Sequence, residues 1–102
     1  MIIVTGSLVV KPGSLTDALT LSIEHVRRSR TENGCISHAV HQDVEYPDRL
    51  VFVEEWSDNA TLAAHFAVPA SRAFAKAISE LAVEAPKLNV FEAKRVSKRK
   101  QT

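Results

Sequence analysis

Three side chains of different chemistry, a carboxylate, an indole and an imidazole, are spaced so that they could surround one small cavity. Glu54 and Trp56 alternate along a strand-like run, so their side chains lie on the same face. His65 follows nine residues after Trp56, on the apolar side of a short helical pattern. These residues favour a catalytic site in which His65, assisted by Glu54, removes a proton and Trp56 orients a substrate oxygen. A structural hydrogen-bonded pair that ties helix to strand is the alternative interpretation.

Six further side chains are candidates for contact with a substrate. Phe52 precedes Glu54 on the same strand face, and His38 shares a face with Ile36 and Val40 of another strand. The aromatic and aliphatic candidates on the helices serve first as core and second as pocket walls. The predicted substrate-binding residues are His38, Phe52, Leu62, Phe66, Phe74 and Arg72, the last for an anionic group.

The spacing of the other reactive side chains predicts no metal site and no cofactor. No two histidines have the His-Glu-x-x-His spacing of a helical zinc site. His25 falls off the main stripe of its helix and is expected to be solvated, and His41 is expected at a dimer contact or in solvent. The three glycines are scattered, so there is no phosphate-binding loop. Cys35 is the only cysteine, which excludes an intrachain disulfide.

Composition is that of a small soluble domain. The chain has 102 residues, of which 45% are hydrophobic and 25% charged, as in an ordinary single globular unit. A formal net charge of +1 provides no global field for nucleic acid or membrane binding. No apolar run approaches the roughly 20 residues that cross a bilayer, and the N-terminus lacks the pattern of a secretory leader. We therefore expect a cytoplasmic protein that binds neither nucleic acid nor membrane.

The hydrophobic pattern predicts four strands and an interrupted second helical region. Apolar positions from Leu15 to Val26 recur at helical spacing, with Ser14 and Asp17 as a capping box and Gly34 at the helix end. The expected strands span 2–10, 35–42, 50–56 and 88–96, and the expected helices begin at Ser14, at Ser57 or Asp58, and at Pro69. This order predicts an α+β, ferredoxin-like βαββαβ fold, a four-stranded antiparallel sheet with helices on one face.

Both faces of the predicted sheet carry apolar side chains. In the first strand Ile2 and Val4 point one way, and Ile3 and Val9 point the other. Helices can cover only one face, and a large exposed apolar patch is unusual on a monomer. Burial of about 500 Å² per chain corresponds to roughly 12 kcal/mol before association costs. We predict an obligate homodimer joined sheet to sheet.

Several motifs recur here in the order and spacing of a known family. They are Asn33-Gly34-Cys35 at the start of the second strand, the Glu54-x-Trp56 pair, His65, and Pro69 ahead of Phe74. With these motifs the chain resembles the antibiotic biosynthesis monooxygenase superfamily over residues 2–93. The resemblance implies a quinol-monooxygenase-like dimeric α/β barrel. We expect one domain over residues 1–96, followed by a basic, disordered tail over 97–102.

Many members of that superfamily oxidise polycyclic phenols or quinols with O₂ and use no metal, flavin or haem. The resemblance therefore implies a cofactor-independent monooxygenase with a small aromatic substrate, and it places Trp56 in a pocket between sheet and helices. Phe52 stands where quinone-forming members have asparagine. His65 stands where haem-degrading members have tryptophan, which argues against haem. A non-oxidative isomerase or a ligand-binding dimer of the same fold is the alternative function.

Overall fold

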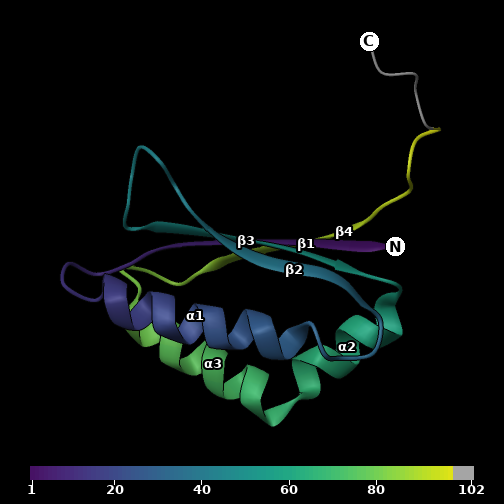
Figure 1. Cartoon of the computed structure of the whole chain (residues 1–102), viewed down its shortest axis with the longest axis horizontal. Helices are drawn as coiled ribbons and strands as arrows, with labels where there is room; N and C mark the ends of the chain where they lie inside the picture. The colour runs from purple at the N-terminus through teal and green to yellow at the C-terminus, as the bar shows by residue number, and fades with distance from the viewer. Residues whose placement is uncertain (98–102) are drawn as a thin grey trace.

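Four runs rich in β-branched and aromatic residues pair into one antiparallel sheet, and the segments between them form helices over one of its faces (Figure 1). The computed structural model describes residues 1–97. The strands are β1 (Ile2–Val9), β2 (Cys35–Gln42), β3 (Arg49–Trp56) and β4 (Lys87–Glu92), and the helices are α1 (Leu15–Ser29), α2 (Asn59–Ala67) and α3 (Pro69–Leu81). The spatial order of the strands is β2-β3-β1-β4. The predicted ferredoxin-like fold is confirmed. Within residues 1–97, no helix has the length and apolar content needed to cross a membrane.

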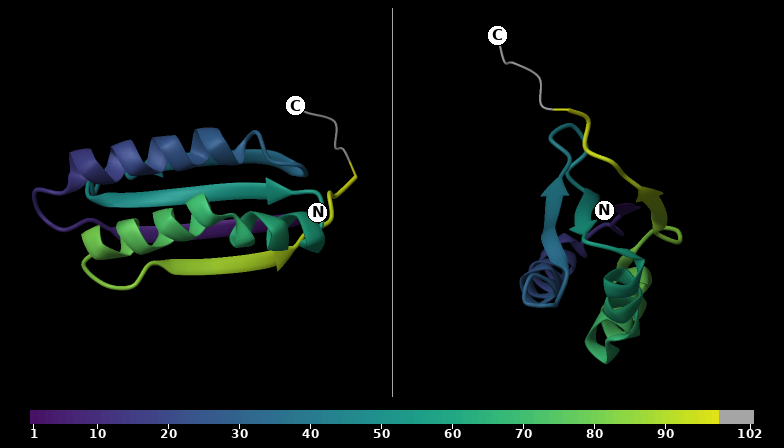
Figure 2. Two further views of the ribbon diagram at one scale, coloured as in Figure 1. Left: turned by 90° about the horizontal axis from the view of Figure 1, so that it is seen from below. Right: turned by 90° about the vertical axis from the view of Figure 1, so that its right-hand side faces the viewer.

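Alternation along β1 and β3 decides which face of the sheet carries the core. Val4 and Leu8 of β1 are buried, as are Phe52 and Trp56 of β3, because side chains at every second position of a strand share a face. Figure 2 shows the helices ranged along one side of the sheet only. The core has two parts, and the one beside the candidate site comprises Ile2, Val4, Trp56 and Leu62.

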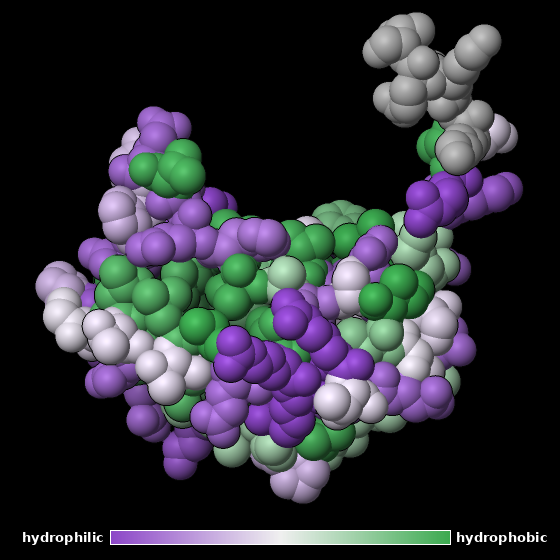
Figure 3. Space-filling view, viewed as in Figure 1, coloured by the Kyte–Doolittle hydropathy of each residue, from purple (hydrophilic) through white to green (hydrophobic). Residues whose placement is uncertain are grey.

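Helix α1 begins where the sequence predicts and buries Ala18, Ser22 and Val26 of the predicted stripe, but it ends earlier and its buried stripe also includes His25 and Ser29. Ser14 is the N-cap residue, but its side chain makes no capping hydrogen bond, so the predicted capping box is wrong. The helix ends at Ser29, not at Gly34. Ile23 is 40% exposed at the seam between α1 and β2, and Figure 3 shows hydrophobic surface where the sheet meets α1. Because α1 packs against α3 as well as β2, its buried stripe turns toward His25.

The break between α2 and α3 follows the predicted local chemistry. Asp58 caps α2 through a complete capping box, in which its side chain accepts a hydrogen bond from the backbone of Thr61. Pro69 stands in the first turn of α3, where its missing N–H costs no hydrogen bond. This break brings His65, near the end of α2, back over the sheet.

Two strand details differ from the sequence prediction. β4 ends at Glu92 rather than at residue 96, and all of its residues are exposed. In β2 the register shifts between Cys35 and Ser37, which leaves Ile36 57% exposed and off the face that carries His38. The predicted basic tail, apart from Ser97, lies outside the described residues.

Gly34 lies in the loop just before β2 and packs against Thr61 of α2, so it is expected to tolerate alanine poorly. Its φ is +84°, and a Cβ at this position would overlap the side chain of Thr61. Thr61 cannot swing away freely because it belongs to the capping box with Asp58. We expect Gly34→Ala to lower the free energy of unfolding by about 2–5 kcal/mol, the sum of a positive-φ penalty and an overpacking cost.

Gly13→Ala provides the matched control for this effect. Its φ is +82°, but a Cβ there would have no neighbour within 4 Å. Only the backbone penalty of about 1–2 kcal/mol is then expected. Urea unfolding of both variants, followed by circular dichroism, measures the difference. Equal losses in the two variants would show that the contact with Thr61 costs nothing.

Candidate functional site

Glu54, Trp56 and His65 meet between the sheet and the helices. Glu54 and Trp56 project from the same face of β3, and the Trp56 indole N–H donates a hydrogen bond of 2.9 Å to Glu54 Oε1. His65 of α2 lies over the indole, with ring centroids 4.5 Å apart and planes tilted by 34°. All three residues are at most 5% exposed. The sequence-based expectation that these side chains share one location is confirmed.

The hydrogen-bond partner of His65 is not the one the sequence indicated. His65 Nδ1 lies 2.8 Å from Glu32 Oε1, whereas His65 Nε2 lies 3.9 Å from Glu54 Oε1. The alternative interpretation, a directly hydrogen-bonded pair of His65 and Glu54, is therefore wrong. Glu32 was missed because the sequence places it inside a longer α1, whereas it lies in the loop that leads into β2. With Nδ1–H donating to Glu32, the lone pair of Nε2 faces Glu54.

His38 is a central member of the site. It is 2% exposed on the inner face of β2, and its Nε2 lies 3.2 Å from Glu54 Oε1. The approach does not have hydrogen-bond geometry, so within residues 1–97 neither ring nitrogen of His38 has a hydrogen-bond partner. A hydrogen bond links β2 to the C-terminal end of α1 at this point: Arg30 Nε donates to the His38 carbonyl at 2.9 Å.

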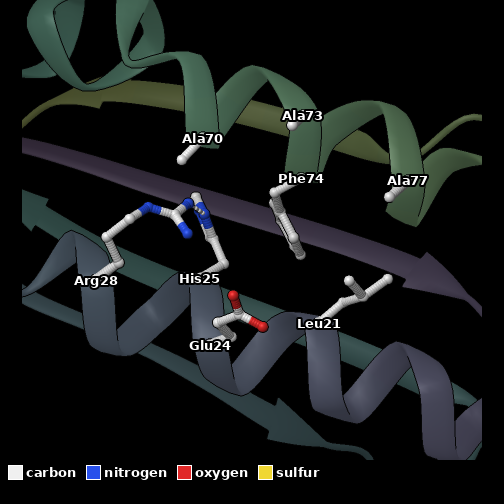
Figure 4. Close-up of a pocket in the computed structure, with 8 residues that line it drawn as sticks. All are labelled: Leu21, Glu24, His25, Arg28, Ala70, Ala73, Phe74 and Ala77. Carbon is white, nitrogen blue, oxygen red and sulfur yellow. Dashed lines mark hydrogen bonds between the residues drawn. The ribbon is translucent and has the colours of Figure 1, made fainter.

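His25 also belongs to the site, and the expectation that it is solvated is wrong. It is 5% exposed, because the buried stripe of α1 is wider than the predicted one and includes it. Its ring stacks on Phe74 of α3 with centroids 4.0 Å apart and planes 5° from parallel. Arg28 Nη2 lies 2.8 Å from His25 Nδ1, which accepts the guanidinium N–H. Figure 4 shows Arg28 and His25 turned toward each other from α1, with Phe74 beside them from α3.

Burial and charge set the protonation of these groups in opposite directions. Burial, followed by the neighbouring His38, His65 and Arg28, lowers the pKa of His25 to about 3, so its imidazole is neutral. Burial alone would raise the pKa of Glu54, but the contacts with His38, Trp56 and His65 together outweigh it and hold that pKa below its usual value. The ionised Glu54 carboxylate and the neutral His25 imidazole therefore belong to the same buried site.

A small pocket opens onto this cluster. Its volume is about 190 Å³, and its lining includes His25, Glu54, His65, Phe66 and Phe74, with Ser71, Arg72, Ala75 and Leu88 around them. Phe66 is 43% exposed at its mouth. Phe66, Phe74 and Arg72 are among the residues predicted to contact a substrate, and all three line this pocket; the contact itself stays a prediction.

Four predicted site residues do not line the pocket: His38 and Trp56 lie buried beside it, and Phe52 and Leu62 lie in the core. Phe52 packs with Leu8 and its neighbours and meets Phe74 edge-on, with ring centroids 5.9 Å apart. Leu62 packs with Trp56 in the smaller core cluster. Neither lines the pocket.

A second hollow of about 270 Å³ lies between α1 and α3 (Figure 4). It shares the stacked pair His25 and Phe74 with the first pocket, and its floor includes Arg28. It is lined mostly by small or apolar side chains and contains neither Glu54 nor His65. The chemically competent groups therefore face the smaller pocket.

Comparison with known proteins identifies the family. The model of the antibiotic biosynthesis monooxygenase family matches residues 1–77. The chain belongs to this family. An uncharacterised protein of Synechocystis is 29% identical over 91 residues, which cover 89% of this chain and 62% of that protein. The chain thus spans less than two thirds of the length of this curated relative.

Solved structures share the architecture described above. A candidate antibiotic biosynthesis monooxygenase from Deinococcus radiodurans superposes with a TM-score of 0.91 at 23% identity, over 99% of this chain and 100% of the other. A conserved protein from Methanosarcina mazei Go1 gives 0.86 at 27% identity, over 91% and 92% of the two chains. A Bacteroides thetaiotaomicron protein of unknown function, described as a possible oxidoreductase, gives 0.84 at 26% identity, over 90% and 96%.

Membership of the antibiotic biosynthesis monooxygenase family does not account for every group in the site. The motifs that carried the resemblance include Glu54, Trp56 and His65, and the structure brings these together. No sequence motif indicated that His25 or Glu32 belongs to the site. The position of His25 depends on the rotation of α1, and that of Glu32 depends on the loop before β2. The Asn33-Gly34 pair was a clue to the position of Glu32, because a loop at that pair can include Glu32 and end the helix before it.

Proposed function

We propose that this member of the antibiotic biosynthesis monooxygenase family oxidises a small phenol or quinol with O₂, without a flavin, haem or metal cofactor. The substrate ring lies against Phe66 and Phe74, and its hydroxyl faces His65 Nε2. His65 takes the phenolic proton as general base, and Glu54 assists. The Trp56 indole N–H, expected from the sequence to orient a substrate oxygen, instead holds the Glu54 carboxylate in place. Arg72 lies at the rim, where it can attract an anionic substituent.

The observation that carries this proposal is the position of His65 between two carboxylates at the edge of a pocket. Glu32 Oε1 lies 2.8 Å from one ring nitrogen and Glu54 Oε1 lies 3.9 Å from the other. A proton taken up on Nε2 gives an imidazolium flanked by negative charge on both sides, which stabilises it. Deprotonation is therefore favoured where the pocket delivers the hydroxyl.

Removal of the proton prepares the substrate for O₂. The phenolate is a better one-electron donor than the neutral phenol, and transfer of one electron to O₂ gives a phenoxyl radical and superoxide. The two radicals combine at the ring carbon opposite the hydroxyl, where the substrate must carry a hydrogen, and the peroxide anion takes back the proton held by His65. The resulting hydroperoxide loses water to give a quinone. The substrate supplies all four electrons that O₂ accepts, so no external reductant is needed. The dry pocket keeps the radical pair together.

Pocket size narrows the substrate class. The volume of about 190 Å³ is below the roughly 300–1,000 Å³ common for drug-sized ligands. An apolar cavity of about 150 Å³ is sufficient for benzene. A single aromatic ring therefore suits this pocket better than the polycyclic phenols that the resemblance implied.

Oxygen consumption by the chelator-treated protein tests the proposal. With guaiacol as substrate, we expect protein-dependent O₂ uptake and, from isotopically labelled O₂, one labelled oxygen in the quinone and the other in water. Absence of uptake with a panel of one-ring phenols and quinols would overturn the proposal. Turnover of a substrate under strict anaerobiosis would instead support the isomerase alternative.

We also propose that the chain forms a homodimer through the outer face of the sheet. Val9, Val53 and Phe91 lie on this face and are 44%, 37% and 51% exposed, and Ile3 pairs with Phe91 beside them. The face is less uniformly apolar than predicted, because Thr5 and other polar residues alternate with these side chains. A second copy would cover the patch and complete the dimeric barrel implied by the family.

Val53→Glu is expected to shift the assembly from dimer to monomer. Val53 pairs with Thr5 on one side and Ala39 on the other, so it stands near the middle of the outer face. Each carboxylate buried there without a partner costs about 3–5 kcal/mol, or roughly 10²–10⁴-fold in the dimer dissociation constant, and the dimer would bury two of them. Sedimentation at micromolar concentration measures the change.

Val44→Glu is the control for added negative charge. Val44 is 97% exposed in the loop between β2 and β3, so the same substitution there should leave the sedimentation coefficient unchanged. A wild-type chain that sediments as a monomer would contradict the proposed interface.

A further inference from the structure

Three histidines that are far apart in the sequence come together beside Glu54. His25 comes from α1, His38 from β2 and His65 from α2, and one ring nitrogen of each lies within 4.8 Å of the others. Their ring centroids are 5.3–5.7 Å apart. The three side chains are 5%, 2% and 3% exposed. Such a group of buried imidazoles is a set of nitrogen donors suited to zinc, iron, copper or nickel.

Glu54 adds an oxygen donor at the right separation. Its Oε1 lies 3.2 Å from His38 Nε2 and 3.9 Å from His65 Nε2. Bonds of about 2.0–2.1 Å to a tetrahedral zinc ion place neighbouring ligand atoms roughly 3.3–3.4 Å apart. The carboxylate and two of the imidazoles therefore need only small side-chain movements to share one ion.

His38 gives an independent reason to expect a ligand. It is 2% exposed, yet within the described residues both of its ring nitrogens lack a hydrogen-bond partner. Burying a polar group without a partner is unfavourable by roughly 1–3 kcal/mol. Nε2 of this ring points to the same oxygen of Glu54 that His65 faces, so an ion at that position would satisfy it.

His65 is already oriented as a metal ligand would be. Its Nδ1 is bonded to the carboxylate of Glu32 at 2.8 Å, which leaves the Nε2 lone pair free to face Glu54. Metal-binding histidines almost always donate their other ring N–H to a carboxylate, carbonyl or water, because this fixes the tautomer and raises the basicity of the ligating nitrogen. Glu32 supplies that contact.

We propose that His38, His65 and Glu54, completed by His25, form a binding site for one divalent transition-metal ion such as Zn²⁺. His25 is the weakest of the four ligands. Its Nδ1 accepts a hydrogen bond from Arg28, so the proton of the neutral ring is on Nε2. To bind the ion through Nε2, the ring must move that proton to Nδ1, which breaks the hydrogen bond. The pocket lined by His25, Glu54 and His65 provides a route for the ion from solvent.

Metal binding is a second role for these side chains, separate from the proposed oxidation, and it has one consequence for that reaction. An ion on His65 Nε2 occupies the lone pair that would accept the phenolic proton. Zn²⁺ is therefore expected to inhibit the metal-free reaction. This consequence rests on the proposed function, but binding of the ion does not, so the two can fail separately.

Titration of the chelator-treated full chain with Co²⁺, in the absence of any substrate, tests the site. We expect saturation at one ion per chain with the visible absorption bands of a four-coordinate nitrogen–oxygen site, and displacement by Zn²⁺. Glu32→Gln is expected to weaken binding by roughly 10–100-fold, as for other groups that support a ligand, and His38→Gln and His65→Gln by more. Glu32 is partly exposed, so its variant should fold even if a buried histidine variant does not.

His41→Gln is the matched control. His41 stands three residues after His38 on the same strand and lies on the outer face of the sheet, which is the proposed dimer face and is turned away from the three histidines. A neutral replacement there should leave the Co²⁺ spectrum and affinity unchanged. Wild-type protein without visible Co²⁺ bands would overturn the proposal. It would also be overturned by binding that survives unchanged in folded His38→Gln protein or is lost in His41→Gln protein.

Discussion

Replacement of His65 by alanine is expected to slow the proposed phenol oxidation by about 10²–10⁴-fold, the usual contribution of a placed general base. The imidazole is the only group at the pocket that has a carboxylate on each side, 2.8 Å from Nδ1 and 3.9 Å from Nε2, among the described residues. Without this imidazole, no group between the two carboxylates can take the proton from the substrate hydroxyl. The loss should fall mainly on kcat, because the aromatic walls Phe66 and Phe74 remain.

The assay needs a chelator and a second histidine variant. Chelation keeps the proposed metal site empty, so that a change in rate reports the base and not the ion. His41→Ala removes an imidazole from the exposed face of β2 and should leave the rate unchanged. Equal rates for wild type and folded His65→Ala protein would show that His65 is not the base and would leave Glu54 as the remaining candidate.

The fold could be predicted because it depends on short-range patterns. Alternation in β1 and β3, the Asp58 cap and Pro69 each specify local structure without reference to the rest of the chain. The errors arose where tertiary contacts decide. The apolar stripe of α1 is compatible with several rotations about the helix axis, and only packing against both β2 and α3 turns His25 inward.

The candidate site could be predicted in part for the same reason. Glu54 and Trp56 lie on one strand, so the period of the strand alone places them together. His38 was expected near the site from the face of its strand, but His25 and Glu32 reach the site from α1 and a loop, and no spacing along the chain reports such distances. The absence of a His-Glu-x-x-His motif therefore says nothing about metal binding here, because the three histidines come from three different elements.

Replacement of Trp56 by alanine is expected to lower the free energy of unfolding by about 3–5 kcal/mol, as for other large buried aromatics. Trp56 is 0% exposed and packs with Ile2, Val4 and Leu62, so its removal leaves a cavity. It also removes the indole N–H, the one hydrogen-bond donor to Glu54 among the described residues. Against a total stability of about 5–15 kcal/mol for a small domain, this is the largest single loss we expect.

Two further variants separate the roles of the indole. Trp56→Phe keeps much of the packing but leaves the buried Glu54 carboxylate without its donor, which should cost about 1–3 kcal/mol. Tyr46→Ala removes an aromatic ring that is 66% exposed and should change stability by less than about 0.5 kcal/mol. Trp56 is the only tryptophan, so urea unfolding must be followed by far-ultraviolet circular dichroism. If the stability of Trp56→Phe matches that of wild type while Trp56→Ala is strongly destabilised, the indole stabilises the fold through its volume alone. The hydrogen bond to Glu54 then orients the carboxylate and contributes nothing to the free energy of unfolding.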